Sequence, residues 1–323
     1  MERSDALHEF IELCDLGAQM GWHERNGGNA SYRMTAHDVA CMKSAFHFVD
    51  DEELVPAPRE IDSAASEKRV PIASEKRVPI ASETDDAARA HLCAWRPLEI
   101  AVPCLANEYF LVTGTGRFMR HVRRAPEQCV GVAQIDAAGE RYRIVWGLQD
   151  AQGTVGACAP TSEFAGHLLL HAERKRATKG AARVAYHCHP TDVVALSTAL
   201  PHEERAITRA LWKAHTECII MFPEGIGVVP CEVPGSMELA RETQRCMAAY
   251  PAALWAHHGL FVTGATFDDA FGLAEVIVKA AGIFRSACAM NGGPEFANTI
   301  SDDDLRSIAR AWKITPNPAF LSE

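Results

Sequence analysis

Apolar residues along the chain repeat with two spacings, one typical of helices and the other of strands. Residues 5–20 predict an amphipathic helix because Leu7, Phe10 and Ile11 share one face. Shorter β-prone runs predict strands at 31–34, 108–113, 129–136, 141–146, 183–189 and 253–259, and the apolar run 219–222 predicts another. Strands interleave with helices, and short turns join several strands. This pattern predicts one α/β domain across residues 1–323, with a mixed rather than purely parallel sheet.

The sequence also marks where helices begin. After Pro160, either Thr161 or Ser162 is the expected N-cap of a helix, and Glu163 is expected in its first turn. The basic residues 174–176 favour the end of that helix, where they complement its dipole. Further helices are expected to begin at Thr191, Ser236 and Ser301.

A tandem repeat interrupts the pattern between residues 65 and 83. The octapeptide Ala-Ser-Glu-Lys-Arg-Val-Pro-Ile occurs twice and then begins a third time. Two such short copies are too few for a repeat domain. The surrounding segment, about 56–95, is rich in charge and proline, which predicts a flexible insertion without catalytic groups. A docking arm is the alternative interpretation.

Composition narrows the class of protein. The net charge of −10 and the pI of about 5.8 argue against nucleic acid or an anionic membrane as the main partner. A small anionic substrate remains compatible, because a few local donors can hold one phosphate. The chain shows no signal peptide and no apolar run of about 18 residues, and its 11 cysteines form no Cys-x-x-Cys pair. We expect a cytoplasmic protein with reduced thiols and a small-molecule partner.

Two histidines in one predicted strand are the strongest chemical signal. His187 and His189 stand two residues apart, just before Pro190. Strand positions i and i+2 face the same side, so both imidazoles would point to one place, while Cys188 would face the core. Such nitrogen ligands suit a divalent metal, zinc before others. The simpler alternative is one hydrogen-bonded core histidine beside one surface histidine.

A third imidazole is available at the strand end that carries His257 and His258. The register of that strand is unknown from sequence, so alternation does not decide which of the two faces the site. Three histidines and one open position would make a catalytic zinc site. Glu163 could fill the open position or act as a general base, although the helix dipole alone also explains an acid in a first helical turn.

Three turns offer groups that could bind an anion. The helix start at Thr161 and Ser162 has main-chain N–H groups and hydroxyls, and the glycine-rich turns 114–116 and 26–29 allow the backbone to approach a ligand closely. Ordinary turn chemistry explains each of these features by itself. Glu217, which precedes the apolar run 219–222, has the pattern of a surface residue, and its spacing assigns it no role.

Six short motifs occur in an order that resembles a known enzyme family. They are Glu24-Arg25-Asn26-Gly27-Gly28-Asn29, Val112-Thr113-Gly114-Thr115-Gly116, Pro160-Thr161-Ser162-Glu163, His187-Cys188-His189, Thr216-Glu217-Cys218 and His258-Gly259. Together they resemble the class II, zinc-dependent sugar-phosphate aldolases, most closely the rhamnulose-1-phosphate branch. The resemblance covers nearly the whole chain except about residues 56–95.

The resemblance implies a role for each motif. It implies one zinc ion per subunit, held by His187, His189 and His258. Glu163 would be a further ligand without substrate and a proton carrier with it. Glu217 matches an acid that a neighbouring subunit contributes in a fourfold-symmetric homotetramer, so that active sites lie at subunit interfaces. The positions that the family uses to hold phosphate correspond to Asn26, Gly28, Asn29, Thr115, Thr161 and Ser162.

The resemblance also implies a fold and a reaction. The family fold is a three-layer α/β/α sandwich around a mixed, largely antiparallel sheet. The implied reaction is the retro-aldol cleavage of L-rhamnulose 1-phosphate to dihydroxyacetone phosphate and L-lactaldehyde. Alternatives are a fuculose-phosphate aldolase, a pentose-phosphate 4-epimerase, or a non-catalytic interaction module of the same fold. Two features depart from the family, namely the insertion and Thr115, where family members place a serine.

Overall fold

The computed structural model describes residues 5–45 and 94–322, and the predicted insertion with its octapeptide repeat lies almost entirely outside these residues. The helices are α1 (Asp5–Gln19), α2 (Ala36–Ala45), α4 (Met119–Val122), α5 (Pro126–Cys129), α6 (Phe164–Ala177), α7 (Thr191–Ala199), α8 (Glu204–Ala214), α9 (Glu217–Met221), α10 (Met237–Met247), α11 (Phe267–Asn291) and α12 (Asp302–Trp312), with 3-10 turns η2 (Pro103–Leu105) and η3 (Pro318–Phe320). The strands are β1 (Asn29–Arg33), β2 (Arg96–Pro97), β3 (Tyr109–Thr113), β4 (Val130–Ile135), β5 (Arg141–Gly147), β6 (Val184–Cys188), β7 (Gly227–Val229), β8 (Ala252–Trp255) and β9 (Gly259–Gly264).

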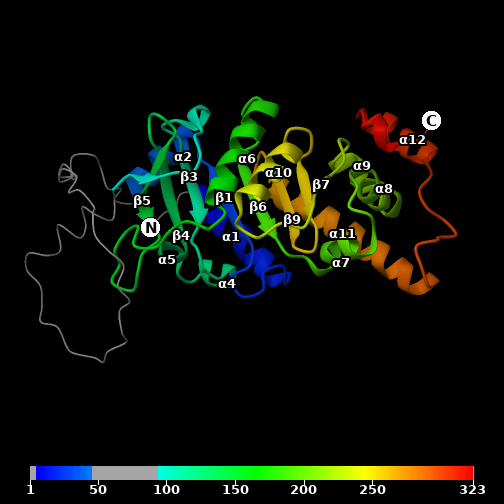
Figure 1. Cartoon of the computed structure of the whole chain (residues 1–323), viewed down its shortest axis with the longest axis horizontal. Coiled ribbons are helices and arrows are strands. Elements are labelled where there is room, and N and C mark those ends of the chain that lie inside the picture. The colour runs from blue at the N-terminus through cyan, green and yellow to red at the C-terminus, as the bar shows by residue number, and fades with distance from the viewer. Residues whose placement is uncertain (1–4, 46–93, 323) are drawn as a thin grey trace, which may run out of the picture.

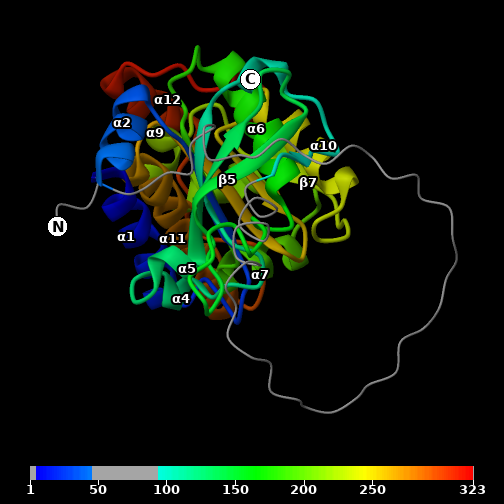
Figure 2. The ribbon, with the colours of Figure 1, turned by 90° about the vertical axis from the view of Figure 1, so that its left-hand side faces the viewer.

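One sheet of nine strands organises the described part of the chain, in the order β2-β5-β4-β3-β1-β6-β9-β8-β7. Neighbouring strands are antiparallel, apart from the parallel pair β7 and β8. Figure 2 shows α1 and α11 on one side of the sheet and α6 and α10 on the other. The predicted three-layer sandwich around a mixed, largely antiparallel sheet is therefore confirmed.

The alternation of side chains along β6 assigns its two faces to different layers. Tyr186 packs against Phe271 of α11, and Cys188 is fully buried on that side, as predicted. His187 faces the other layer, where its ring stacks on Phe261. The central strands thus bury apolar residues against α11 and leave alternate positions for polar chemistry on the α6 side.

Several strand ends meet at one edge of the sheet because neighbouring strands run in opposite directions. β1 begins where β6 ends, with Asn29 opposite His187. β9 begins beside the end of β6, and β8 ends opposite the start of β9, at the pair Trp255 and Gly259. Residues far apart in sequence are therefore gathered at this edge (Figure 1).

Most predicted elements are present, with three corrections. The apolar run after Glu217 forms the helix α9 rather than a strand, because it packs among α8, α11 and α12 instead of joining the sheet. The helix after Pro160 begins at Phe164, so Glu163 occupies the N-cap position and neither Thr161 nor Ser162 does. β8 ends at Trp255, so the two histidines lie in the turn beyond it.

Other local signals are confirmed. The Ser236 and Ser301 hydroxyls accept main-chain N–H groups at the starts of α10 and α12. The ten cysteines in the described ranges are free thiols. Among residues 5–45 and 94–322, no helix combines the length and the apolar character needed to cross a bilayer.

Candidate functional site

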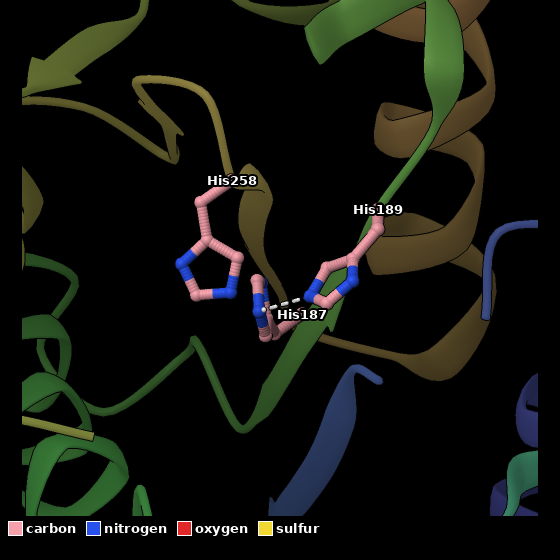
Figure 3. Close-up of side chains that lie close together, drawn as sticks. All are labelled: His187, His189 and His258. Atoms are coloured by element: carbon pink, nitrogen blue, oxygen red, sulfur yellow. Dashed lines mark hydrogen bonds between the residues drawn. The ribbon is translucent and has the colours of Figure 1, made fainter. Parts of the chain in front are cut away.

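His187 and His189 meet at the end of β6, where their Nε2 atoms are 3.0 Å apart (Figure 3). A partner fixes the opposite side of each ring. His187 Nδ1 is 3.0 Å from the Leu260 carbonyl oxygen, and His189 Nδ1 is 2.7 Å from a carboxylate oxygen of Glu24. Both partners only accept hydrogen bonds, so both Nδ1 atoms carry a proton, and the two Nε2 atoms face each other.

His258 completes the group from the turn between β8 and β9. One ring nitrogen from each of His187, His189 and His258 lies within 4.8 Å of the others. The adjacent His257 is exposed, has a left-handed φ of 59°, and binds Ser197 through its main-chain N–H instead. Gly259 permits this close turn, because a Cβ there would lie 2.3 Å from the Cys188 carbonyl oxygen. The turn thus decides which of the two neighbouring histidines lies beside His187 and His189.

The three imidazoles fit a divalent metal. Two nitrogens about 2.0–2.1 Å from one tetrahedral zinc are about 3.3–3.4 Å apart, close to the 3.0 Å between the two Nε2 atoms. Burial lowers the pKa of His258 to about 4 and that of His187 well below its usual value, so both rings are neutral, as ligands must be. His258 Nδ1 is also buried with no hydrogen-bond partner in the described chain.

The Glu24 carboxylate orients His189, which leads to a prediction. Replacing Glu24 with alanine removes the acceptor of the Nδ1 proton, so the metal dissociation constant is expected to rise about 10- to 100-fold. Glu24→Gln keeps an acceptor oxygen and is expected to have a smaller effect. Competition with a chromophoric chelator measures both constants. Equal metal affinities of the wild type and the alanine variant would show that Glu24 does not support the metal site.

Glu163 lies at the N-cap of α6, beside the histidines. The Asn29 side-chain amide donates from Nδ2 to Glu163 Oε2 at 2.7 Å. Burial raises the pKa of Glu163, and the hydrogen bond from Asn29 opposes that rise only in part. A proton on His189 would also lower this pKa, which shows that the two side chains are close enough to interact. A carboxyl with a raised pKa next to a cluster that could hold a metal is suited to carry a proton.

Behind Glu163 lies a row of buried polar side chains, of which the sequence analysis named only Asn29, as a candidate phosphate-binding residue. Asn29 Oδ1 is 2.5 Å from His167 Nε2, and the Ser31 hydroxyl is 2.6 Å from His167 Nδ1 and 2.8 Å from His171 Nε2. The signal was present in the sequence, since Glu163, His167 and His171 recur every four residues along one helix face. Ser31 likewise follows Asn29 at the strand spacing of two.

The buried histidines make stability depend on pH. Burial lowers the pKa of His23 to about 4, that of His167 to about 3 and that of His171 well below 6.5. Below about pH 6.5 the unfolded chain gains a proton at each position that the folded chain does not, so stability falls as pH falls. Each histidine contributes a slope of ~1.4 kcal/mol per pH unit.

Urea unfolding of the chelator-treated protein between pH 5 and 6 measures that slope, because there the unfolded histidines are largely protonated and the folded ones are not. His171→Gln removes one titrating group, so its slope is expected to be smaller by ~1.4 kcal/mol per pH unit, whatever its stability at neutral pH. A slope identical to that of the wild type would contradict a neutral His171 in the folded state.

Several of the residues predicted to bind phosphate lie in neighbouring loops. A bridge between Gly114 and Pro160 holds the turn after β3 beside the start of α6. The Thr161 N–H donates to the Thr113 carbonyl oxygen at 2.8 Å, so the expectation that this N–H is free for an anion is wrong. Thr115 and Ser162 are exposed beside it, and their hydroxyls face no partner among the described side-chain bonds.

The turn 24–28 lies just before β1, at the edge of the sheet where β6 ends. Gly28 has a φ of 74°, and a Cβ there would lie 2.7 Å from the His187 carbonyl oxygen, so only glycine allows the turn to pack against β6. Asn26 is exposed on this turn, whereas Asn29 is buried with both ends of its amide occupied. Glu217 lies apart, exposed at the start of α9, beyond the β7 edge of the sheet (Figure 1).

Comparison with known proteins agrees with this arrangement. The model of the family described as "Class II Aldolase and Adducin N-terminal domain" matches residues 81–284. Rhamnulose-1-phosphate aldolase from Escherichia coli is 34% identical over 302 residues, which cover 94% of this chain and 91% of that protein. The protein of the same name from Mannheimia succiniciproducens is 35% identical over 301 residues, covering 93% of this chain and 92% of the relative.

Solved structures show the same fold. A sugar-phosphate aldolase from Thermotoga maritima has a TM-score of 0.62 at 23% identity, covering 88% of this chain and 96% of its own. An L-fuculose 1-phosphate aldolase has a TM-score of 0.52 at 16% identity, covering 97% and 99%. The sequence identity over nearly the full length, the family match and the histidine cluster agree with one another. The chain belongs to the class II aldolase and adducin family.

Proposed function

We propose that the protein is a zinc-dependent aldolase that cleaves L-rhamnulose 1-phosphate to dihydroxyacetone phosphate and L-lactaldehyde. The observation that carries this proposal is the convergence of three imidazoles beside Glu163. The names of the full-length relatives supply the substrate. The presence of both the histidine cluster and the acid favours an enzyme over an interaction module.

His187, His189 and His258 would hold the metal, with Leu260 and Glu24 fixing the first two rings. When bound, the zinc ion would act as a Lewis acid that stabilises the negative charge left on the substrate when the C3–C4 bond breaks. Glu163 would deliver a proton to the reacting carbon of the phosphate-bearing fragment, and Asn29 holds its carboxylate in place. The exposed hydroxyls of Thr115 and Ser162 would contact the phosphate.

The test of this function is a cleavage assay on L-rhamnulose 1-phosphate that follows dihydroxyacetone phosphate. Activity that a chelator removes and zinc restores is the expected result. L-fuculose 1-phosphate and a pentose phosphate serve as comparison substrates under the same conditions. Cleavage or epimerisation of one of these in preference to L-rhamnulose 1-phosphate would assign the protein to another branch of the family.

We further propose that Glu217 acts in the site of a neighbouring subunit in a homotetramer, removing the proton from the C4 hydroxyl. The exposed position of Glu217 at the start of α9 supports this assignment, because it leaves the side chain available to another subunit. A mixture of Glu163→Gln and Glu217→Gln subunits, dissociated and reassembled, would contain sites with both acids intact. Recovery of activity on mixing two inactive variants is expected. No recovery, with light scattering showing mixed tetramers, would contradict a shared site.

A further inference from the structure

Four buried side chains form a hydrogen-bonded row that ends on Glu163, and the proposed reaction assigns no role to three of them. Ser31 and His167 are fully buried, His171 is 1% exposed and Asn29 is 7% exposed. Strand β1 supplies Asn29 and Ser31, whose side chains share one face, and helix α6 supplies the histidines from successive turns. Aromatic rings flank the row, with Phe261 against His167 and Phe110 against His171.

The chemistry of the groups fixes the direction of every bond in this row. An ionised Glu163 only accepts, so Asn29 must present its NH₂ to Glu163 and its oxygen to His167. His167 therefore donates from Nε2, which leaves a lone pair on Nδ1. The Ser31 hydroxyl donates its single proton to that lone pair, and its oxygen accepts from His171 Nε2. All donors in the row point toward Glu163.

This direction matters because the Asn29 amide could otherwise turn over. If the amide were reversed, its oxygen would face the Glu163 carboxylate at 2.7 Å, and its NH₂ would meet the Nε2–H of His167. The pKa of His167, lowered to about 3 by burial, keeps the ring neutral with one donor and one acceptor. Apolar residues would fill this helix-sheet interface with less desolvation, so packing alone does not explain two buried imidazoles.

We propose that His167 is a positioning residue for Glu163, acting through Asn29, with Ser31 and His171 holding it in the tautomer that donates from Nε2. The inference rests on the proposed function in that Glu163 is taken as the proton carrier. It concerns Ser31, His167 and His171, to which the proposed reaction gives no role. If His167 has this role, a substitution two or three hydrogen bonds away from Glu163 alters turnover.

Two substitutions at one position separate this role from simple packing. His167→Leu removes the donor to Asn29, and kcat is expected to fall about 10- to 100-fold with KM within about threefold and zinc content unchanged. His167→Gln keeps an N–H donor at a similar distance from the backbone and is expected to retain most of the wild-type kcat. A leucine variant with normal kcat, or a glutamine variant as slow as the leucine variant, would overturn the proposal.

A matched control tests whether any lost buried hydrogen bond has the same effect. Thr208 is fully buried and its hydroxyl accepts from the Ile226 N–H, away from the row. Thr208→Val is expected to lower the melting temperature without changing kcat. If His167→Leu does not fold, Ser31→Ala takes its place, because it frees His167 to adopt the other tautomer. A normal kcat in Ser31→Ala would then count against the proposal.

The tautomer itself can be observed without any activity. Nitrogen NMR of protein labelled with ¹⁵N-histidine, assigned with the His167→Gln and His171→Gln variants, is expected to show protonated Nε2 at both positions. A proton on Nδ1 of His167 would overturn the proposal. The wild-type protein could show the expected tautomer and yet cleave no ketose phosphate. That result would refute the proposed reaction but would still support the hydrogen-bonded row whose donors point toward Glu163.

Discussion

Replacing Glu163 with glutamine is expected to reduce kcat roughly 100- to 10,000-fold while the protein keeps its metal. Glutamine has nearly the same shape as glutamate, and its oxygen can still accept the hydrogen bond from Asn29. What is lost is the exchangeable carboxyl proton, whose pKa burial raises toward the working pH. The substitution therefore separates proton transfer from metal binding.

Three measurements on this variant decide the assignment. Single-turnover cleavage gives the chemical step, elemental analysis gives the zinc content, and thermal unfolding reports the fold. Glu12→Gln, the same change at an exposed position of α1, is the matched control and is expected to behave as wild type. Near-normal turnover of Glu163→Gln would contradict a role for this carboxyl as proton carrier. Loss of metal together with turnover would instead make Glu163 mainly a ligand.

Replacing His258 with alanine is expected to abolish both stoichiometric zinc and turnover. A catalytic zinc site of three histidines retains only two ligands after this change, so the loss of affinity is expected to exceed the ~10- to 100-fold typical of residues that merely orient a ligand. His258 makes none of the side-chain hydrogen bonds described for the chain, and its Nδ1 is buried without a partner, so its removal disturbs the fold little.

The neighbouring histidine provides the control. His257→Asn changes an exposed imidazole outside the cluster, and asparagine tolerates the left-handed backbone found there. This variant is expected to keep its zinc and its turnover. Calorimetric zinc titration of both variants compares the two positions directly. If the His257 variant lost its metal and the His258 variant retained it, the third ligand would be the other histidine.

Local sequence signals predicted most of the elements but not the boundaries that matter for the site. A helix follows Pro160, as the sequence predicts, but its cap falls on Glu163 rather than on Thr161 or Ser162. The Thr161 N–H instead donates to the Thr113 carbonyl oxygen of β3, which holds the backbone before the helix against the sheet. The error has a physical origin, because pairing with a distant strand outweighed the local preference for a hydroxyl at the cap.

The run 219–222 is a second case in which local sequence does not decide the structure. Its apolar residues are equally compatible with a buried strand and with a short buried helix, and periodicity does not separate the two over so few residues. Helix α9 forms because its neighbours are α8, α11 and α12, which offer apolar surface and no strand edge. The position of Glu217 on an exposed helix start follows from that environment.

Three features follow from the sequence alone: the α/β class, the acidic net charge, and the placing of His187 and His189 on one face of a strand. Each of them depends on composition or on periodicity within a short segment. Periodicity left His257 and His258 open, and only the family resemblance implied His258. The structure supplies the physical reason, since a turn of left-handed backbone sets the directions of the two rings. It alone also brought Asn29, Ser31, His167 and His171 into one row behind Glu163. Strand register and helix packing decide such contacts between distant residues, and neither is encoded in any one segment.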